Sequence, residues 1–281
     1  MKKKFPLIRI IAVFSCLALC YIIFGLINSF YGNPVSATIA TNKIHTYIAK
    51  TYPENNFIIE KATYNFKDSS YSSIVHSPTS EDTIFRVYEQ NGRIEDDYAY
   101  EVANNFTTYR RLEDALDKEV ETIIKKEYPY QMRLIGAKMP DVPDSEQYFT
   151  LDMPYHIQEL PLPIEVLVWT GTDKPSYEIM AERLLELKSL MEKYKIPVEY
   201  YSMNLEYPYH EENGELKPDI FDSLSINQFP VSELVDRPDL PKLLEEHVTA
   251  IEAEWDKEKE AEIEKANGNE EEIDAILEKM K

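Results

Sequence analysis

The chain has 281 residues and a formal net charge of −21, from 51 acidic and 30 basic residues. A negative field of this size repels nucleic acid, so we expect no nucleic-acid partner. Both cysteines, Cys16 and Cys20, lie in an apolar N-terminal stretch, while 20 tyrosines and 11 phenylalanines provide apolar side chains for a core. The rest of the chain therefore has no disulfide and must be stabilised by packing.

A signal-anchor is predicted at the N-terminus. Lys2, Lys3, Lys4 and Arg9 precede residues 10–30, an apolar run without Asp, Glu, Lys or Arg. At about 1.5 Å per residue this run reaches the ~30 Å thickness of a bilayer's hydrocarbon core. Because no basic residue follows until Lys43, the N-terminus is expected in the cytoplasm and the bulk of the chain outside it. We therefore predict a single-pass protein of the cell membrane, with residues 1–33 as basic tail and transmembrane anchor and the lipid bilayer as its partner.

A cleaved signal peptide is the alternative interpretation. Val35-Ser36-Ala37 fits the small-residue pattern that signal peptidase accepts, with a cut after Ala37. The apolar run is longer than the roughly 7–15 residues of a usual signal core, which favours retention. A lipoprotein would need a small residue before the modified cysteine, whereas Leu19 precedes Cys20.

Residues 34–129 are predicted to form a helix, a four-stranded antiparallel sheet and a second helix. The first helix covers residues 34–52, with apolar positions Val35, Ile39, Ile44, Tyr47 and Ile48. Four strands follow, at residues 56–66, 71–75, 83–90 and 93–102. Asn91-Gly92 is the two-residue turn of the last hairpin.

The faces of this sheet and the second helix also follow from the pattern. Phe85 and Val87 should face a helical cover, while Arg86 and Tyr88 face the partly wet side. The second helix, residues 107–127, has an apolar stripe formed by Leu112, Leu116, Val120, Ile123 and Ile124.

Residues 130–230 are predicted to form a second small α/β domain. After a strand over residues 132–139, the clearest unit is a strand at 162–170, a helix opened by Lys174-Pro175-Ser176 and ending near Tyr194, and a strand at 197–205. The connection is long enough for the two strands to be parallel.

Residues 231–281 are predicted to be an acidic helical C-terminal segment. Its apolar stripe consists of Leu240, Leu244, Val248, Ile251 and Trp255. Asn267-Gly268-Asn269 should end this helix before a short acidic helix over residues 271–280. The whole chain is thus expected to be an α+β protein with an N-terminal transmembrane helix.

Short stretches of the first domain resemble a known family. Tyr31-Gly32-Asn33-Pro34 follows the anchor, and Tyr64-Asn65-Phe66-Lys67-Asp68 and residues 77–82 follow in the predicted sheet. In these stretches the chain resembles the YfjL-like membrane-associated proteins of Bacillus and its relatives. The resemblance implies the anchor and the helix-sheet architecture, but it carries over no catalytic or ligand-binding residue.

No arrangement of residues indicates catalysis. The histidines are scattered singly, at His45, His76, His156, His210 and His247. Ser77 adjoins His76, but neighbouring side chains of a strand point to opposite faces and cannot form a catalytic pair. The motifs Tyr209-His210-Glu211-Glu212, in an expected loop, and Glu95-Asp96-Asp97 offer only weak ion binding. We therefore predict no catalytic, cofactor-binding or metal-binding residue and no cofactor.

Two surfaces are candidates for recognition. Tyrosines with prolines between them could line a groove, and they are Tyr200, Tyr201, Tyr207 and Tyr209. The helix around Trp255 could dock a protein partner. We expect an extracytoplasmic binding or interaction region, with an envelope-associated sensing or accessory role, rather than an enzyme. The alternatives are a hydrolase using acidic residues in an inter-domain cleft and a weak metal-responsive module.

Overall fold

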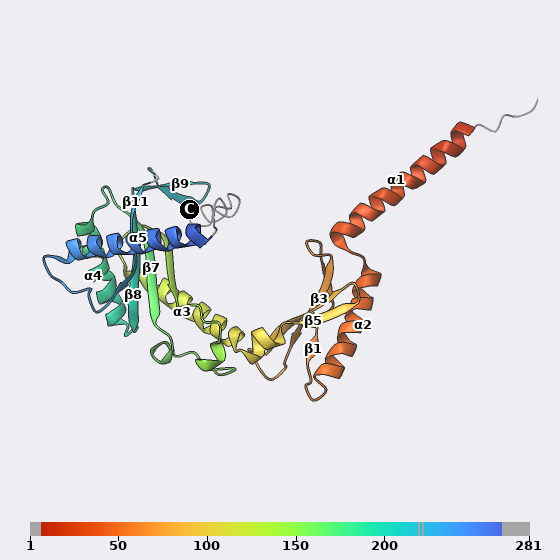
Figure 1. Cartoon of the computed structure of the whole chain (residues 1–281), viewed down its shortest axis with the longest axis horizontal. Coiled ribbons are helices and arrows are strands. Elements are labelled where there is room, and N and C mark those ends of the chain that lie inside the picture. Colours follow the sequence, from red (N-terminus) through yellow and green to blue (C-terminus); the bar gives the residue numbers. More distant parts are fainter. Residues whose placement is uncertain (1–6, 219, 221, 266–281) are drawn as a thin grey trace, which may run out of the picture. The chain divides into compact units, whose positions relative to one another are not determined.

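The computed structural model describes residues 7–218, 220 and 222–265 (Figure 1). Its contacts divide the chain into two compact units. The first comprises Met1–Arg111 and Pro143–Pro154, and the second comprises Leu112–Val142 and Tyr155–Lys281. Both combine helices with a sheet, which confirms the α+β fold class. The functional division into anchor, two domains and acidic segment stays a prediction.

Helix α1 (Leu7–Tyr31) is apolar and packs against little else. Its described side chains are mostly exposed, including Phe14 at 67% and Phe24 at 66%. Its 25 residues rise about 37 Å, more than the ~30 Å of a hydrocarbon core. By length and composition α1 can cross a bilayer.

Helix α2 (Pro34–Thr51) begins at a sequence signal for helix initiation. Asn33 is its N-cap, since the Asn33 side chain accepts a hydrogen bond from the backbone N–H of Ser36 at 2.8 Å. Pro34 follows in the first turn, where its missing N–H costs nothing. The helix is the one predicted over residues 34–52, but its buried stripe is Ala37, Ala40, Ile44 and Ile48. Val35 and Ile39 were expected in that stripe and are exposed.

The first unit contains a five-stranded antiparallel sheet of β1 (Ile58–Ile59), β2 (Thr63–Asn65), β3 (Ser70–His76), β4 (Ile84–Gln90) and β5 (Arg93–Asp96). Both β1 and β2 pair with β3, and β4 lies between β3 and β5. Asn91 and Gly92 both have positive φ at the β4–β5 turn, which confirms the predicted hairpin.

Two strand predictions in this unit are corrected. The segment 56–66 forms two short strands because the N–H of Ala62, between them, donates to Thr41 Oγ1 of α2 at 3.0 Å instead of to a strand. The segment 93–102 is a strand only to Asp96, and a π-helix, η1 (Ala99–Ala103), follows. Asp96 starts this turn, since its Oδ1 accepts the N–H of Tyr98 at 3.1 Å.

One face of this sheet is covered by α2, as predicted. Phe85 and Val87 are buried in a cluster with Ile44 and Ile48 of the helix, whereas Arg86 and Tyr88 lie half-buried on the other face. This opposite face carries the polar side chains of the unit.

A buried ion pair ties the β3–β4 connection to the next helix. Asp82 is 2% exposed and receives two hydrogen bonds from Arg111, from Nε at 2.6 Å and from Nη2 at 2.7 Å. Thr108 Oγ1 donates to the same carboxylate at 2.6 Å, and Arg111 also donates to the carbonyl oxygen of Met153. The chain thereby satisfies a charge that would be costly to bury alone.

The second unit contains a four-stranded sheet with strand order β11-β8-β7-β6. Its strands are β6 (Met132–Lys138), β7 (Ile164–Gly171), β8 (Val198–Glu206) and β11 (Ser223–Pro230). Strands β7 and β8 are parallel and are joined through α4 (Tyr177–Lys193), which confirms the predicted strand-helix-strand unit. Helix α4 starts at the predicted place, where Ser176 Oγ accepts the N–H of Ile179.

Helices cover one face of this second sheet. Helix α4 packs on β8 and on α5 (Leu240–Lys265), and α5 contacts β11. The core between them includes Val166, Val168, Met180, Leu184, Met203 and Phe229. In α5 Leu240 and Leu244 are buried, but Trp255 is exposed, so the stripe ends earlier than predicted. The predicted helix stop at 267–269 and the helix at 271–280 lie outside the described residues.

Helix α3 (Phe106–Glu127) protects an edge of the same sheet. Its stripe, which includes Leu116 and Val120, is buried as predicted. Asp117 Oδ1 accepts the backbone N–H of Ala137, and Glu113 Oε1 accepts that of Met139, both at 2.9 Å. The two carboxylates accept backbone N–H groups in β6 and just after it. These N–H groups could otherwise pair with a strand of another chain.

Small turns connect the remaining segments. Two 3-10 turns, η2 (Ser145–Gln147) and η3 (Ile157–Glu159), lie between β6 and β7. A hairpin of β9 (Tyr209–Glu212) and β10 (Glu215–Pro218) follows β8. This hairpin corrects the loop expected at Tyr209-His210-Glu211-Glu212.

Removing Arg111 should destabilise the first unit. Arg111→Met leaves the Asp82 carboxylate buried without its cation, so we expect a loss of about 3 kcal/mol in the free energy of unfolding. Urea denaturation of the detergent-solubilised full chain, followed by circular dichroism, measures it. Arg93→Met is the control, because Arg93 pairs with Glu95 in solvent and such a pair contributes at most about 1 kcal/mol. Equal losses in both variants would contradict a structural role for the buried pair.

The same pair should make stability depend on pH. Burial raises the pKa of Asp82, but hydrogen bonds from Arg111 and Thr108 outweigh it and hold the pKa below its usual range. The resulting stabilisation is complete above the unfolded carboxyl pKa of about 3.9 and is lost as pH falls through the lower folded pKa. The stability difference between the wild type and Asp82→Asn should therefore shrink as the pH falls below about 4. A difference that grows on acidification would contradict this sign.

Candidate functional site

The second unit exposes a polar face on the side of its sheet away from α4 and α5. Side chains alternate along a strand, so the residues between the core positions of β7 and β8 point to this side. They include Glu165, Trp169, Tyr200, Ser202, Asn204 and Glu206. Two clefts of ≈ 500 Å³ each open on this polar face, and each contains one buried glutamate.

The first cleft is built around an arginine–glutamate pair. Arg133 of β6 donates from Nε to Glu206 Oε2 at 2.9 Å and from Nη2 to Glu206 Oε1, and its guanidinium lies 4.4 Å from the centre of the Trp169 ring. Tyr209 Oη donates to Glu206 Oε2 at 2.6 Å. We call these four residues the Arg133 cluster. A two-pronged ion pair stacked on an indole has a fixed geometry before any ligand arrives.

A glycine lets Tyr209 reach this cluster. At Gly171, the last residue of β7, a Cβ atom would lie 3.1 Å from the Tyr209 ring. This is tighter than ordinary van der Waals contact, so a larger residue there would push the ring away from Glu206.

The cluster keeps its glutamate ionised. Burial raises the pKa of Glu206, but the hydrogen bonds from Arg133 and Tyr209 outweigh burial and lower the pKa below its usual range. Burial and the neighbouring Glu206 carboxylate raise the pKa of the Tyr209 phenol. At neutral pH the cluster therefore presents a carboxylate, a guanidinium and a neutral phenol, which suits recognition rather than proton donation.

The second cleft is built around Glu165 at the other end of the polar face. Glu165 is 8% exposed and accepts hydrogen bonds from Ser202 Oγ at 2.5 Å and from Gln228 Nε2 at 3.2 Å. Lys138 Nζ lies 3.4 Å from Glu165 Oε2. Glu113, Asp141 and Tyr200 also line this cleft.

Gln228 holds an unusual backbone conformation at this cleft. Its φ is +49°, and the register of β11 shifts around it, between Ile226 and Phe229. The N–H of Gln228 donates to Ser202 Oγ at 2.8 Å, which fixes the bulge. A left-handed non-glycine residue costs of order 1 kcal/mol and is often retained at functional sites.

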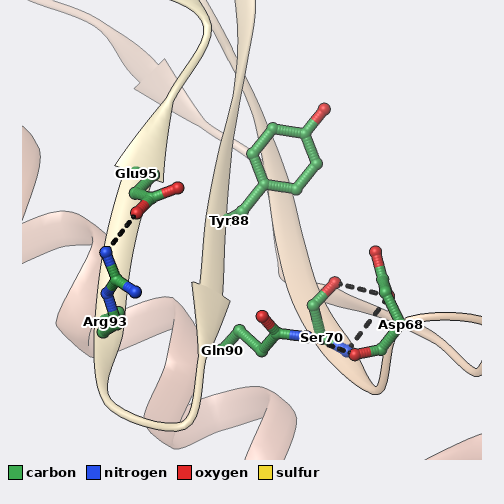
Figure 2. A pocket seen from close by; sticks show the side chains of 6 residues that line it. All are labelled: Asp68, Ser70, Tyr88, Gln90, Arg93 and Glu95. Carbon is green, nitrogen blue, oxygen red and sulfur yellow. Dashed lines mark hydrogen bonds and ion pairs between the residues drawn. The ribbon is translucent and has the colours of Figure 1, made fainter.

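The polar face of the first unit carries two smaller clefts. Figure 2 shows one of ≈ 240 Å³, lined by Asp68, Ser70, Tyr88, Gln90, Arg93 and Glu95. Ser70 Oγ donates to Asp68 at 2.8 Å, and Arg93 pairs with Glu95 at 3.1 Å. Both members of that ion pair are more than two-thirds exposed, so water screens the pair and its geometry is weakly fixed.

The other cleft of the first unit, of ≈ 250 Å³, contains Asp97 and Glu101. Burial and the charge of Asp97 raise the pKa of Glu101, although Arg110, at 2.5 Å, opposes them. Glu101 lies on the π-helix η1, a distortion that often marks functional positions.

The structure separates most residues singled out from the sequence. Of the tyrosines, Tyr200 lines the Glu165 cleft and Tyr209 joins the Arg133 cluster, while Tyr201 is buried in the core. The acidic triplet diverges, since Asp96 accepts hydrogen bonds from Tyr47 and Tyr52 of the α2 side whereas Glu95 pairs with Arg93. In the described part of the chain, no three His, Cys, Asp or Glu side chains meet in a way that could hold a metal ion.

Sequence reasoning missed the Arg133 cluster and the hairpin that supplies Tyr209. The hairpin had a signal in the sequence, the pair Asn213-Gly214, which matches the pair at Asn91-Gly92. In the structure both residues have positive φ in a two-residue turn. The cluster itself had none, because Arg133 and Glu206 are 73 residues apart.

Family models match most of the chain. Residues 4–98 match the YfjL-like N-terminal domain, and residues 115–245 match the YfjL-like C-terminal domain. The chain belongs to the YfjL-like family. Membership extends the resemblance seen in the first domain to the second. Apart from Glu113, the residues that line the two clefts of the second unit lie within the YfjL-like C-terminal domain. No similar protein was found among the curated proteins or the solved structures.

Removing Arg133 should change the surroundings of Trp169. In a Trp255→Phe background Trp169 is the remaining tryptophan, and Arg133→Ala uncovers its ring and leaves Glu206 without its cation. We expect a red shift in tryptophan emission and a loss of about 2–3 kcal/mol in stability. Arg237→Ala, which removes an exposed pair with Asp239, is the control and should change neither quantity. Unchanged Trp169 emission in Arg133→Ala would refute the stacked geometry.

Proposed function

We propose that this YfjL-like protein is a single-pass membrane protein whose extracytoplasmic region binds a protein partner in an envelope-associated sensing or accessory role. Helix α1 is long and apolar enough to cross a bilayer, which supports the anchor. The basic residues before α1 support a cytoplasmic N-terminus and an extracytoplasmic bulk.

The observation that carries the binding role is the Arg133 cluster. Arginine and aromatic side chains dominate the energy of protein interfaces, and they do so best when neighbours hold them in place. Here Glu206 and Trp169 hold the guanidinium before a partner binds, so little conformational entropy is lost on association. The cleft also carries apolar Leu216 and Pro218 beside Asn204, a mixture typical of recognition sites.

A hydrolase remains the second candidate, and one observation favours it. General acid catalysis needs a carboxyl with a raised pKa, and Glu101 has one beside Asp97 in a cleft of the first unit. Two facts weigh on the other side: Arg110 stabilises the ionised form of Glu101, and the Glu101 cleft, at ≈ 250 Å³, is smaller than the Arg133 cleft, at ≈ 500 Å³.

Photo-crosslinking in living cells tests the binding role. A photoreactive phenylalanine analogue replaces Glu215, an exposed residue that lines the Arg133 cleft, and in the control it replaces Glu182 on the exposed side of α4. We expect one discrete crosslinked protein from position 215 and none from position 182. Trp169→Leu, which removes the indole but keeps an apolar side chain, should reduce the product several-fold, while Glu101→Gln should leave it unchanged. Equal crosslinking from positions 215 and 182 would contradict the proposal.

A further inference from the structure

The end of α1 is fixed to the sheet of the first unit. Tyr64 Oη of β2 donates to the carbonyl oxygen of Ser29 at 3.1 Å, and Tyr71 Oη of β3 accepts the N–H of Asn33 at 3.1 Å. Between them Gly32 has φ +63°, and a Cβ atom there would lie 2.6 Å from Tyr64 Cγ and 2.7 Å from Tyr71 Oη. Only glycine permits this close approach of the backbone to both tyrosines at a positive φ.

This corner places the β2–β3 turn beside the last apolar residues of α1. The ring centres of Phe30 and Phe66 are 6.0 Å apart, and Phe66 immediately follows β2. Phe66 is 53% exposed although it is a large apolar side chain, and Lys67 next to it is exposed as well. The turn therefore presents an aromatic ring and a cation at the depth of Phe30.

The first turns of α2 show the same tendency. Val35 and Ile39 are 69% and 51% exposed, whereas Ile44 and Ile48, farther from α1 along the helix, are buried. Exposed apolar side chains thus gather where the chain leaves α1, although a stable soluble surface would cover them or replace them with polar residues.

We propose that the β2–β3 turn, through Phe66, inserts into the outer leaflet of the phospholipid bilayer beside α1. This inference rests on the proposed anchoring of α1. Phe30 ends the apolar run, so a ring in contact with it lies at the boundary between acyl chains and headgroups. The transfer of the Phe66 ring from water into the bilayer is favourable, and the ammonium of Lys67 can extend to the lipid phosphates. The first unit is then held at the membrane surface by two contacts, α1 and the turn, instead of by α1 alone.

An environment-sensitive fluorophore tests this in the full chain. Cys16→Ser and Cys20→Ser remove the native thiols, and Lys67→Cys carries a nitrobenzoxadiazole label next to intact Phe66. The protein is reconstituted into phosphatidylethanolamine–phosphatidylglycerol vesicles with or without a nitroxide lipid that quenches near the headgroup. We expect blue-shifted emission that the nitroxide quenches, since the label would lie within about 5–10 Å of the headgroup–acyl boundary.

Two further variants isolate the role of the ring. Adding Phe66→Ser should shift the emission of the label at position 67 back to the red and reduce its quenching. Adding Ile58→Ser should have no effect, because Ile58 is a similarly exposed apolar residue that pairs with His76, at the opposite end of β3 from the turn.

A label at Tyr21→Cys separates this inference from the anchor on which it rests. Protection at position 21 together with water-like emission at position 67 would leave the anchor intact and overturn the membrane contact of the turn. Water-like emission at both positions would overturn both. An identical response to Phe66→Ser and Ile58→Ser would also overturn the role assigned to Phe66.

Discussion

The transfer of α1 from water into lipid is the constraint on which the rest of this account depends. Most of its 25 residues are apolar, and most side chains from Ile11 to Tyr31 are exposed. Each buried methylene contributes about 0.8 kcal/mol, so a helix of this kind in water would be strongly unfavourable. A bilayer would remove this apolar surface from water without help from the rest of the chain. The contacts at Gly32 join α1 to the sheet of the first unit, so the placement of α1 also bears on that sheet.

Each unit follows one design: a sheet with helices on one face and polar side chains on the other. In an acidic protein, a carboxylate that is buried without a cation would lower the free energy of unfolding. Instead the buried carboxylates are paired, Asp82 with Arg111 in the first unit and Glu206 with Arg133 in the second. The first pair ties chain segments together, whereas the second lines a cleft, which is why we assign recognition to the second.

The sequence predicted what depends on local pattern. The helical apolar run, the asparagine–glycine turn at 91–92, the helix opened by Lys174-Pro175-Ser176 and the strand-helix-strand unit from β7 to β8 were all confirmed. The faces of β4 were also predicted, because alternation in a strand is strict.

What failed depended on contacts between distant residues. The strand at 56–66 is divided because Ala62 bonds to Thr41 of another element, and no local signal reports that bond. Val35 and Ile39 fit the helical period, yet their exposure depends on where α1 directs the helix. The Arg133 cluster joins β6, β7, β8 and β9, so composition and spacing could not reveal it.

Measuring the orientation of the chain across the membrane is the most direct test. The two native cysteines can be replaced, so that each introduced cysteine is the single labelling site. Because both native cysteines lie in α1, single cysteines can be introduced on either side of it after Cys16→Ser and Cys20→Ser. Intact, wall-stripped cells are treated with a membrane-impermeant maleimide. The account predicts that Lys174→Cys, an exposed position of the second unit, is labelled in intact cells, whereas Lys3→Cys is labelled only after permeabilisation. Labelling of Lys3→Cys but not Lys174→Cys in intact cells, or recovery of the Lys174→Cys protein from the medium, would contradict it.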